Sequence, residues 1–159
     1  RRVFEPAGPL NRKKMDLSLL AGWPVIIEQA VAWGEMDSYG HVNNIVYFRY
    51  FENARLEYFR RLGWPVAGRP TGVGPILAST QCRFRKQLMW PDRIAIGARV
   101  SQIGDDRFTL EHQIISEKMN ALVAEGSGLI VTYDYASERK APIPDEMRRK
   151  IAELQANTV

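Results

Sequence analysis

Hydrophobic positions in the middle of the chain recur at the spacing of an α-helix. Between residues 45 and 62 an apolar face repeats at steps of four and three residues: Tyr47, Phe51, Ala54, Tyr58 and Leu62. Asn43 or Asn44 is a suitable N-cap, and Gly63 followed by Pro65 ends the helix. A helix this rich in aromatic side chains needs a large apolar surface around it.

The segments around this helix alternate apolar and polar residues, as antiparallel strands with one buried face do. Strands are predicted over residues 25–33, 76–85, 93–101, 108–114 and 121–133, with hairpin turns at 104–106 and 118–120 and a short closing helix over 144–154. This order predicts an α+β protein with a curled antiparallel β-sheet of about five strands wrapped around one long central helix. A chain of 159 residues without internal repeats is expected to form one such domain.

Charge is concentrated at the start of the chain. Residues 1–14 hold five basic side chains and one acidic one, which accounts for the whole formal net charge of +4. The rest of the chain has no basic excess, so no nucleic-acid partner is expected. We expect a flexible basic arm over residues 1–20 and a single domain over residues 21–159.

The composition also disfavours a membrane protein, a secreted protein and a metal-binding protein. No apolar run approaches the roughly 20 residues that span a bilayer, and residues 1–6 lack the apolar core of a signal peptide, so we expect a cytoplasmic protein without a membrane partner. The single cysteine, Cys82, excludes an internal disulfide and is expected to be an inert thiol. With two histidines and one cysteine, no metal site is expected.

The candidate chemistry lies in the turn before the helix. Asp37, His41, Asn43 and Asn44 occur within eight positions that lead directly into the aromatic segment. The first N–H groups of a helix have no intrahelical acceptor and attract negative charge. A carboxylate facing such a helix start can act on a carbonyl carbon while the free amides hold the oxyanion that forms.

Residues 33–44, Trp-Gly-Glu-Met-Asp-Ser-Tyr-Gly-His-Val-Asn-Asn, are followed by Tyr47 and by the Glu-Asn-Ala-Arg run of residues 52–55. This D-x-x-G-H-x-N-N-x-x-Y pattern with a downstream E-x-A-R closely resembles the signature of hotdog-fold acyl-CoA thioesterases, in the 4-hydroxybenzoyl-CoA thioesterase-like branch. The resemblance covers roughly residues 23–153. It implies hydrolysis of acyl-CoA thioesters to a free carboxylic acid and coenzyme A, with no cofactor beyond the coenzyme A of the substrate.

The resemblance also implies an assembly and a set of roles. Similar proteins form homodimers whose sheets join edge to edge, often paired again into dimers of dimers, with active sites at the dimer interface. Asp37 would be the catalytic carboxylate, and the amides near Asn44 and Ile45 would polarise the thioester carbonyl. Members specialised for 4-hydroxybenzoyl-CoA carry an aromatic and proline pair instead of His-x-Asn-Asn, so this chain is more similar to hydrolases with a broad acyl range.

Several roles stay open at this point. Asp37 either attacks the carbonyl or draws a proton from water, and His41 either orients Asp37 or water or only fixes the loop. Asn43, Asn44, Ile45 and Tyr47 are the expected oxyanion and substrate-binding residues, with both asparagines acting chiefly as helix caps. Arg83, Arg85 and Lys86 are candidate contacts to the coenzyme A phosphates, although exposed strand charges are common.

Three secondary assignments complete the picture. Glu52 and Arg55, three positions apart, are expected to pair within the helix, with approach of Glu52 to the acyl pocket as the alternative. His112 is expected to be a satisfied core or interface residue. An acyl-ACP thioesterase is one alternative function, although the neutral body disfavours an acidic carrier protein. A non-catalytic acyl-CoA-binding protein of the same fold is the other.

Overall fold

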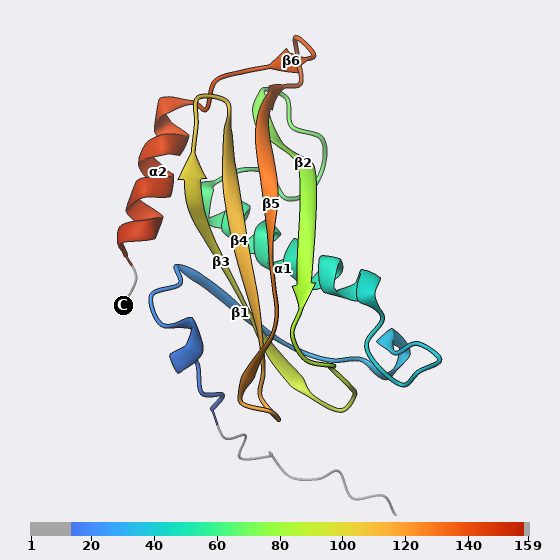
Figure 1. The fold of residues 1–159 in the computed structure, drawn as a ribbon. Coiled ribbons are helices and arrows are strands. Elements are labelled where there is room, and N and C mark those ends of the chain that lie inside the picture. Colours follow the sequence, from blue (N-terminus) through green and yellow to red (C-terminus); the bar gives the residue numbers. More distant parts are fainter. Residues whose placement is uncertain (1–13, 158–159) are drawn as a thin grey trace, which may run out of the picture.

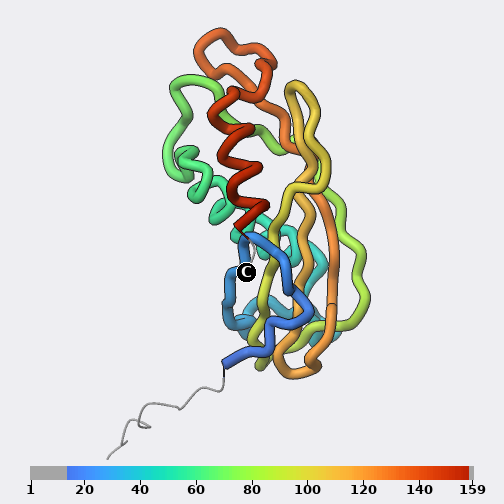
Figure 2. The backbone as a smooth tube through the Cα atoms, turned by 90° about the vertical axis from the view of Figure 1, so that its left-hand side faces the viewer, coloured from blue at the N-terminus to red at the C-terminus, as the bar shows by residue number. Residues whose placement is uncertain are grey.

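Five long antiparallel strands and one short one form a single sheet in the computed structural model, which describes residues 14–157 (Figure 1). The strand order is β1-β3-β4-β5-β2, and β6 pairs with β5. The strands are β1 (Val25–Ala30), β2 (Val73–Phe84), β3 (Arg93–Ile103), β4 (Arg107–Ser116), β5 (Ala121–Asp134) and β6 (Arg139–Lys140). Two α-helices, α1 (Asn44–Leu62) and α2 (Asp145–Ala156), lie on the same side of the sheet (Figure 2). The expected curled sheet around one central helix is confirmed.

Helix α1 begins and ends as the sequence predicts. Asn43 is the N-cap, because its Oδ1 accepts a hydrogen bond from the backbone N–H of Ile45 (3.1 Å). Gly63 ends the helix in the left-handed conformation with φ of 81°, which a side chain would strain. The predicted apolar face is buried against the sheet, together with Tyr50 and Phe59.

A glycine in β5 sets how closely α1 approaches the sheet. A Cβ atom on Gly126 would lie 2.5 Å from the ring of Phe51, so any side chain there would push the helix away. The Phe51 ring instead stacks on the ring of His112 from β4, with centroids 5.0 Å apart. The middle of α1 is therefore held directly against the strands.

The opposite face of the sheet is partly covered by the segment before β1. Along β3, Ile96 and Ala98 face α1, whereas Gly97 lies under Trp23, whose ring would be 2.7 Å from a Cβ at that position. Met15 and Leu20 are buried in the same cluster, and Ser18–Leu20 form a short 3-10 helix, η1. Residues 15–20 are thus packed on the sheet, although the sequence analysis assigned residues 1–20 to a flexible arm. Residues 1–13 lie outside the described residues.

Other differences from the prediction are local. Strand β1 ends at Ala30, earlier than residue 33, because Trp33–Glu35 form a second 3-10 helix, η2. The expected one-sided burial fails in β2, whose residues 77–81 are exposed, because β2 is an edge strand. No helix among residues 14–157 is long and apolar enough to cross a membrane.

Candidate active site at the start of the central helix

The loop between β1 and α1 folds back on itself as a tight turn. The Asp37 backbone N–H donates to the carbonyl of His41 (2.8 Å), and the Gly40 N–H donates to the carbonyl of Asp37 (3.0 Å). Gly40 has φ of 77°, a conformation that favours glycine, and Met36 pairs with Val42 as an isolated β-bridge. These bonds place Asp37 beside the first residues of α1.

The Asp37 carboxylate is only partly engaged. Its Oδ1 accepts a hydrogen bond from the backbone N–H of Tyr39 (2.9 Å), which fixes the side chain in the turn. Its Oδ2 accepts no hydrogen bond within residues 14–157. One oxygen thus orients the group and the other is available for chemistry.

A cavity of about 290 Å³ adjoins this turn. Six of the predicted site residues line it together: Asp37, His41, Asn44, Tyr47, Arg85 and Lys86. Tyr47 and Phe84 form an aromatic wall, with ring centroids 5.0 Å apart in an edge-on arrangement. The cavity therefore combines one carboxylate, one imidazole, two cations and an apolar wall.

The first backbone N–H groups of α1 differ in whether they are already hydrogen-bonded. The Ile45 N–H donates to Oδ1 of Asn43, and the Val46 N–H donates to the Asn43 carbonyl (3.0 Å). The Asn44 N–H has no hydrogen-bond partner within the described part of the chain. Asn44 also lines the cavity, so we expect its backbone N–H to be the donor for a ligand oxygen.

The three remaining predicted residues lie apart from this cavity. Asn43 serves as the cap, and the exposed Ile45 lines a neighbouring cavity of about 490 Å³. Arg83 lines a hollow on the opposite face of the sheet, together with Trp23 and Arg99. Within one chain, the structure does not bring Arg83 near Asp37.

A sequence-family model, that of the thioesterase-like superfamily, matches residues 31–151, which are most of the described chain. The chain belongs to this family. The PA2801 protein from Pseudomonas aeruginosa is 31% identical, with a TM-score of 0.73 over 81% of this chain and 98% of that one. A thioesterase from Thermus thermophilus, crystallised with coenzyme A and zinc, is 28% identical, with a TM-score of 0.75 over 86% of this chain and 98% of that one.

A curated relative matches over a shorter stretch. The Bacillus subtilis protein YsmA is 32% identical over 83 residues, which are 52% of this chain and 55% of YsmA. The match thus spans about half the length of that relative. As for metals, residues 14–157 contain no group of three or more histidine, cysteine, aspartate or glutamate side chains that could hold an ion.

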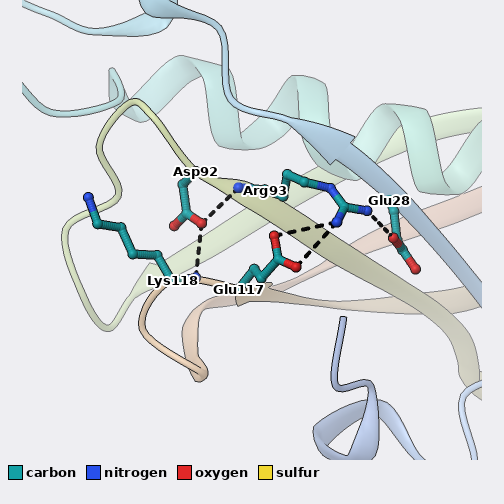
Figure 3. A network of polar contacts seen from close by, with 5 residues as sticks. All are labelled: Glu28, Asp92, Arg93, Glu117 and Lys118. Atoms are coloured by element: carbon teal, nitrogen blue, oxygen red, sulfur yellow. Dashed lines mark hydrogen bonds and ion pairs between the residues drawn. The ribbon is translucent and has the colours of Figure 1, made fainter. Parts of the chain in front are cut away.

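The basic side chains of this thioesterase-like domain differ in whether a carboxylate of the protein already pairs with them. Arg85 forms an ion pair with Glu125 of β5, whereas Lys86 has no ion pair within residues 14–157. Arg93, outside the cavity, is held by two carboxylates: its guanidinium donates to Glu28 (2.6 Å) and to Glu117 (3.2 Å), and so joins β1, β3 and the turn after β4 (Figure 3). Lys86 is therefore the cation of the cavity that is best placed to contact an anionic ligand.

A second network holds the loop that follows β2. Oδ1 of Asp92 accepts the backbone N–H groups of Arg93 (2.7 Å) and Lys118 (3.1 Å), as Figure 3 shows. The Asp92 carbonyl accepts the N–H of Val31 (2.9 Å). The loop is thereby fixed to the segment that carries Asp37.

Three side assignments of the sequence analysis have different outcomes. Glu52 pairs with Arg49 (3.0 Å) and not with Arg55, so that prediction is wrong. Burial raises the pKa of the Cys82 thiol to about 11, which suits an inert thiol. His112 is buried as expected, but only its Nδ1 is satisfied, by the Gly97 carbonyl (3.2 Å); its Nε2 has no partner among the described residues.

Sequence reasoning missed residues on both sides of the turn. Phe84 and Gln87 line the cavity, but they come from the end of β2 and the loop after it, some forty positions away, and no local pattern marks them. Glu35 accepts a hydrogen bond from the hydroxyl of Tyr50 (2.6 Å). The one available signal was an acidic residue two positions before Asp37 and a tyrosine on the face of the helix.

Proposed function

We propose that this protein hydrolyses acyl-CoA thioesters to a carboxylic acid and coenzyme A. One observation carries the proposal: Asp37 and Asn44 line the same cavity, and within residues 14–157 one Asp37 carboxylate oxygen and the Asn44 backbone N–H have no hydrogen-bond partner. Thioester hydrolysis needs an oxygen nucleophile or base and a donor for the carbonyl oxygen. The start of α1 offers both within one turn of chain.

The carbonyl oxygen would accept the Asn44 N–H, at the positive end of the α1 dipole. Oδ2 of Asp37 then has two routes. It attacks the carbonyl carbon, the C–S bond breaks to release the coenzyme A thiolate, and water cleaves the resulting anhydride. Alternatively, it takes a proton from a water molecule that attacks the same carbon, and the C–S bond then breaks to release the coenzyme A thiolate and the carboxylic acid. His41 lines the same cavity, and in this proposal it orients the water or the Asp37 side chain.

The basic side of the cavity supports coenzyme A as the carrier. Arg85 and Lys86 stand beside Asp37, and phosphate groups form strong charge-assisted hydrogen bonds with such side chains. The similar thioesterase from Thermus thermophilus was crystallised with coenzyme A. The pantetheine arm of coenzyme A would then pass along the aromatic wall of Tyr47 and Phe84.

A second copy of the chain would complete the site. Among residues 14–157, strand β2 pairs on one side only, with β5, so its other side can extend the sheet. Phe84 at the end of β2 is 49% exposed, and Ile45 at the start of α1 is 69% exposed. A homodimer with paired β2 edges covers both apolar side chains and closes the cavity that holds Asp37.

The test is a thiol-release assay with short, long, branched and aromatic acyl-CoAs, and with the same acyl groups on acyl carrier protein. The expected result is turnover of at least one acyl-CoA class by the wild type and loss of turnover in Asp37→Asn. Faster hydrolysis of the acyl groups on acyl carrier protein would show that acyl carrier protein, and not coenzyme A, is the natural carrier. Binding without turnover in the wild type would show a non-catalytic acyl-CoA-binding protein and overturn the proposal.

A further inference from the structure

We infer that Glu35 is a positioning residue, whose carboxylate, held by Tyr50 of α1, fixes the Asp37 turn against the start of the helix. The inference rests on the proposed function, because it assigns Glu35 a part in placing the catalytic carboxylate. Glu35 itself does not line the cavity of Asp37 and lies on the neighbouring one. Its effect is therefore exerted through the loop.

The side chain of Glu35 ties two segments together. Its Oε2 accepts hydrogen bonds from the hydroxyl of Tyr50 (2.6 Å) and from the backbone N–H of Ala32 (2.8 Å). Tyr50 is completely buried on the face of α1 that packs on the sheet. Burial and the neighbouring carboxylate both raise the pKa of Tyr50, so its hydroxyl remains a donor at every physiological pH.

The main chain of Glu35 adds a third attachment. Its carbonyl accepts the N–H of Asn43 (2.9 Å), the N-cap residue of α1. Glu35 is thus bonded both to the first residue of the helical cap and to a buried side chain in the second turn. Asp37 follows two residues later, within the turn that Met36 and Val42 close as a β-bridge.

Within residues 14–157, no other side chain of this loop bonds to a side chain of α1. Among residues 31–43, the Glu35–Tyr50 bond is the one hydrogen bond between a loop side chain and an α1 side chain in the described structure. Without it, the loop would keep its internal turn but lose a fixed point on the body of the helix. The distance between the Asp37 carboxylate and the Asn44 amide would then vary, and small misplacements of catalytic groups are costly, up to about 10²-fold in rate.

The same helix supplies a matched control. Tyr58 lies two turns further along, is also completely buried, and donates its hydroxyl to Oε1 of Gln155 in α2 (3.0 Å). Tyr50→Phe and Tyr58→Phe therefore remove the same atom from the same kind of site. Only the first removal touches the loop that carries Asp37.

The experiment measures steady-state hydrolysis of the best acyl-CoA by the wild type and four variants. Tyr50→Phe is expected to lower kcat about tenfold with KM within about twofold, since the loss concerns geometry at the reacting atoms. Tyr58→Phe is expected to leave both constants unchanged. Glu35→Gln keeps an oxygen acceptor for Tyr50 and should retain most of kcat, whereas Glu35→Ala should fall at least as far as Tyr50→Phe.

A second readout is independent of activity. The N–H groups of Asp37, Gly40, Val42 and Asn43 are all hydrogen-bonded, so their exchange with deuterium reports how well the loop is held. Exchange of these amides should be about tenfold faster in Tyr50→Phe and unchanged in Tyr58→Phe.

The two readouts separate failure of the inference from failure of the proposed function. If the wild type hydrolyses acyl-CoA and Tyr50→Phe retains the wild-type kcat, Glu35 does not position Asp37. If the wild type hydrolyses nothing, the proposed function fails, and unchanged exchange of the loop amides in Tyr50→Phe then overturns the positioning role as well. Faster exchange confined to Tyr50→Phe supports the positioning role when it accompanies the lower kcat, or when the wild type has no measurable activity.

Discussion

The two ends of α1 differ in how far their polar groups are hydrogen-bonded and their side chains buried. At the C-terminal end, Gly63 turns the chain, the Trp64 N–H donates to the Phe59 carbonyl (3.0 Å), and Leu62 is fully buried. At the N-terminal end, the Asn44 amide has no partner among the described residues, and the Asp37 carboxylate keeps one oxygen free beside a cavity. The C-terminal end, the closed end, is therefore completed by packing and hydrogen bonds. At the N-terminal end, the open end, one backbone N–H and one carboxylate oxygen have no partner within residues 14–157.

Because of this difference, substitutions at the two ends of α1 should affect different properties of the protein. Groups at the closed end contribute buried apolar area, so their loss should lower the free energy of unfolding. The Asp37 carboxylate and the Asn44 amide at the open end are not part of the hydrophobic core, so their loss should lower the rate of hydrolysis. Substitutions at the two ends should therefore separate activity from stability.

The largest effect is expected from Asp37→Asn at the open end. The amide can still accept the Tyr39 N–H but is neither a nucleophile nor a base, so kcat/KM should fall by about 10²-fold or more. The measurement is thiol release from acyl-CoA, with a thermal melt of the same sample. A melting temperature within a few degrees of the wild type is expected, and near-normal turnover would remove Asp37 from the chemistry.

Leu62→Ala at the closed end should show the reverse pattern. The truncation leaves a cavity in the core, and such losses typically cost about 2–5 kcal/mol of unfolding free energy. Urea unfolding measures the cost, and thiol release per folded molecule should stay near the wild-type value. A loss of activity in the fully folded variant would show that the two ends are coupled.

His112, under the middle of α1, should make stability depend on pH. Burial lowers its pKa to about 3 from an ordinary value of 6.5. Between these values the unfolded chain binds a proton that the folded chain does not, so the free energy of unfolding falls as pH falls, by up to about 1.4 kcal/mol per pH unit.

The comparison variant is His112→Phe, which keeps a ring against Phe51 and cannot titrate. Urea unfolding of both proteins from pH 7 to pH 4 should give a shallower slope for the variant, by about one proton. Equal slopes would mean that the histidine is protonated in the folded protein. Other groups that titrate in this range contribute to both slopes and cancel in the difference.

The smallest effect is expected from Asn43→Ala. Loss of the cap should lower the unfolding free energy by about 1 kcal/mol and release the Ile45 N–H. Because the Asn44 amide is already free, hydrolysis should change less than threefold, well below the effect of Asp37→Asn. Asn43→Asp, which keeps the accepting oxygen, should restore stability, and a large drop in kcat in Asn43→Ala would show that the cap itself holds the helix start in its catalytic geometry.

The sequence predicted those parts of the molecule that depend on neighbours along the chain. The apolar spacing of α1, its two caps and the turn of Asp37 all lie within residues 37–63, so their geometry follows from local rules. The wall formed by Phe84 and the cover formed by Trp23 over Gly97 depend on segments that meet only through the sheet. No periodicity marks such encounters.

The arginines near the end of β2 illustrate the same limit. Arg83 and Arg85, two positions apart, would share one face of a continuous strand. The strand ends at Phe84, and the N–H groups of Arg85 and Lys86 both donate to the Val123 carbonyl (2.8 and 3.1 Å). The chain turns at this point, so Arg85 and Lys86 reach the cavity of Asp37 and Arg83 remains on the other face.

The most direct test of the account is a crystal structure of Asp37→Asn with an acyl-CoA bound, since this variant should hold its substrate without cleaving it. The account predicts the thioester carbonyl oxygen about 2.7–3.2 Å from the Asn44 nitrogen, with the side chain of residue 37 beside the carbonyl carbon. An acyl-CoA bound with its thioester on the opposite face of the sheet, or away from the start of α1, would contradict it.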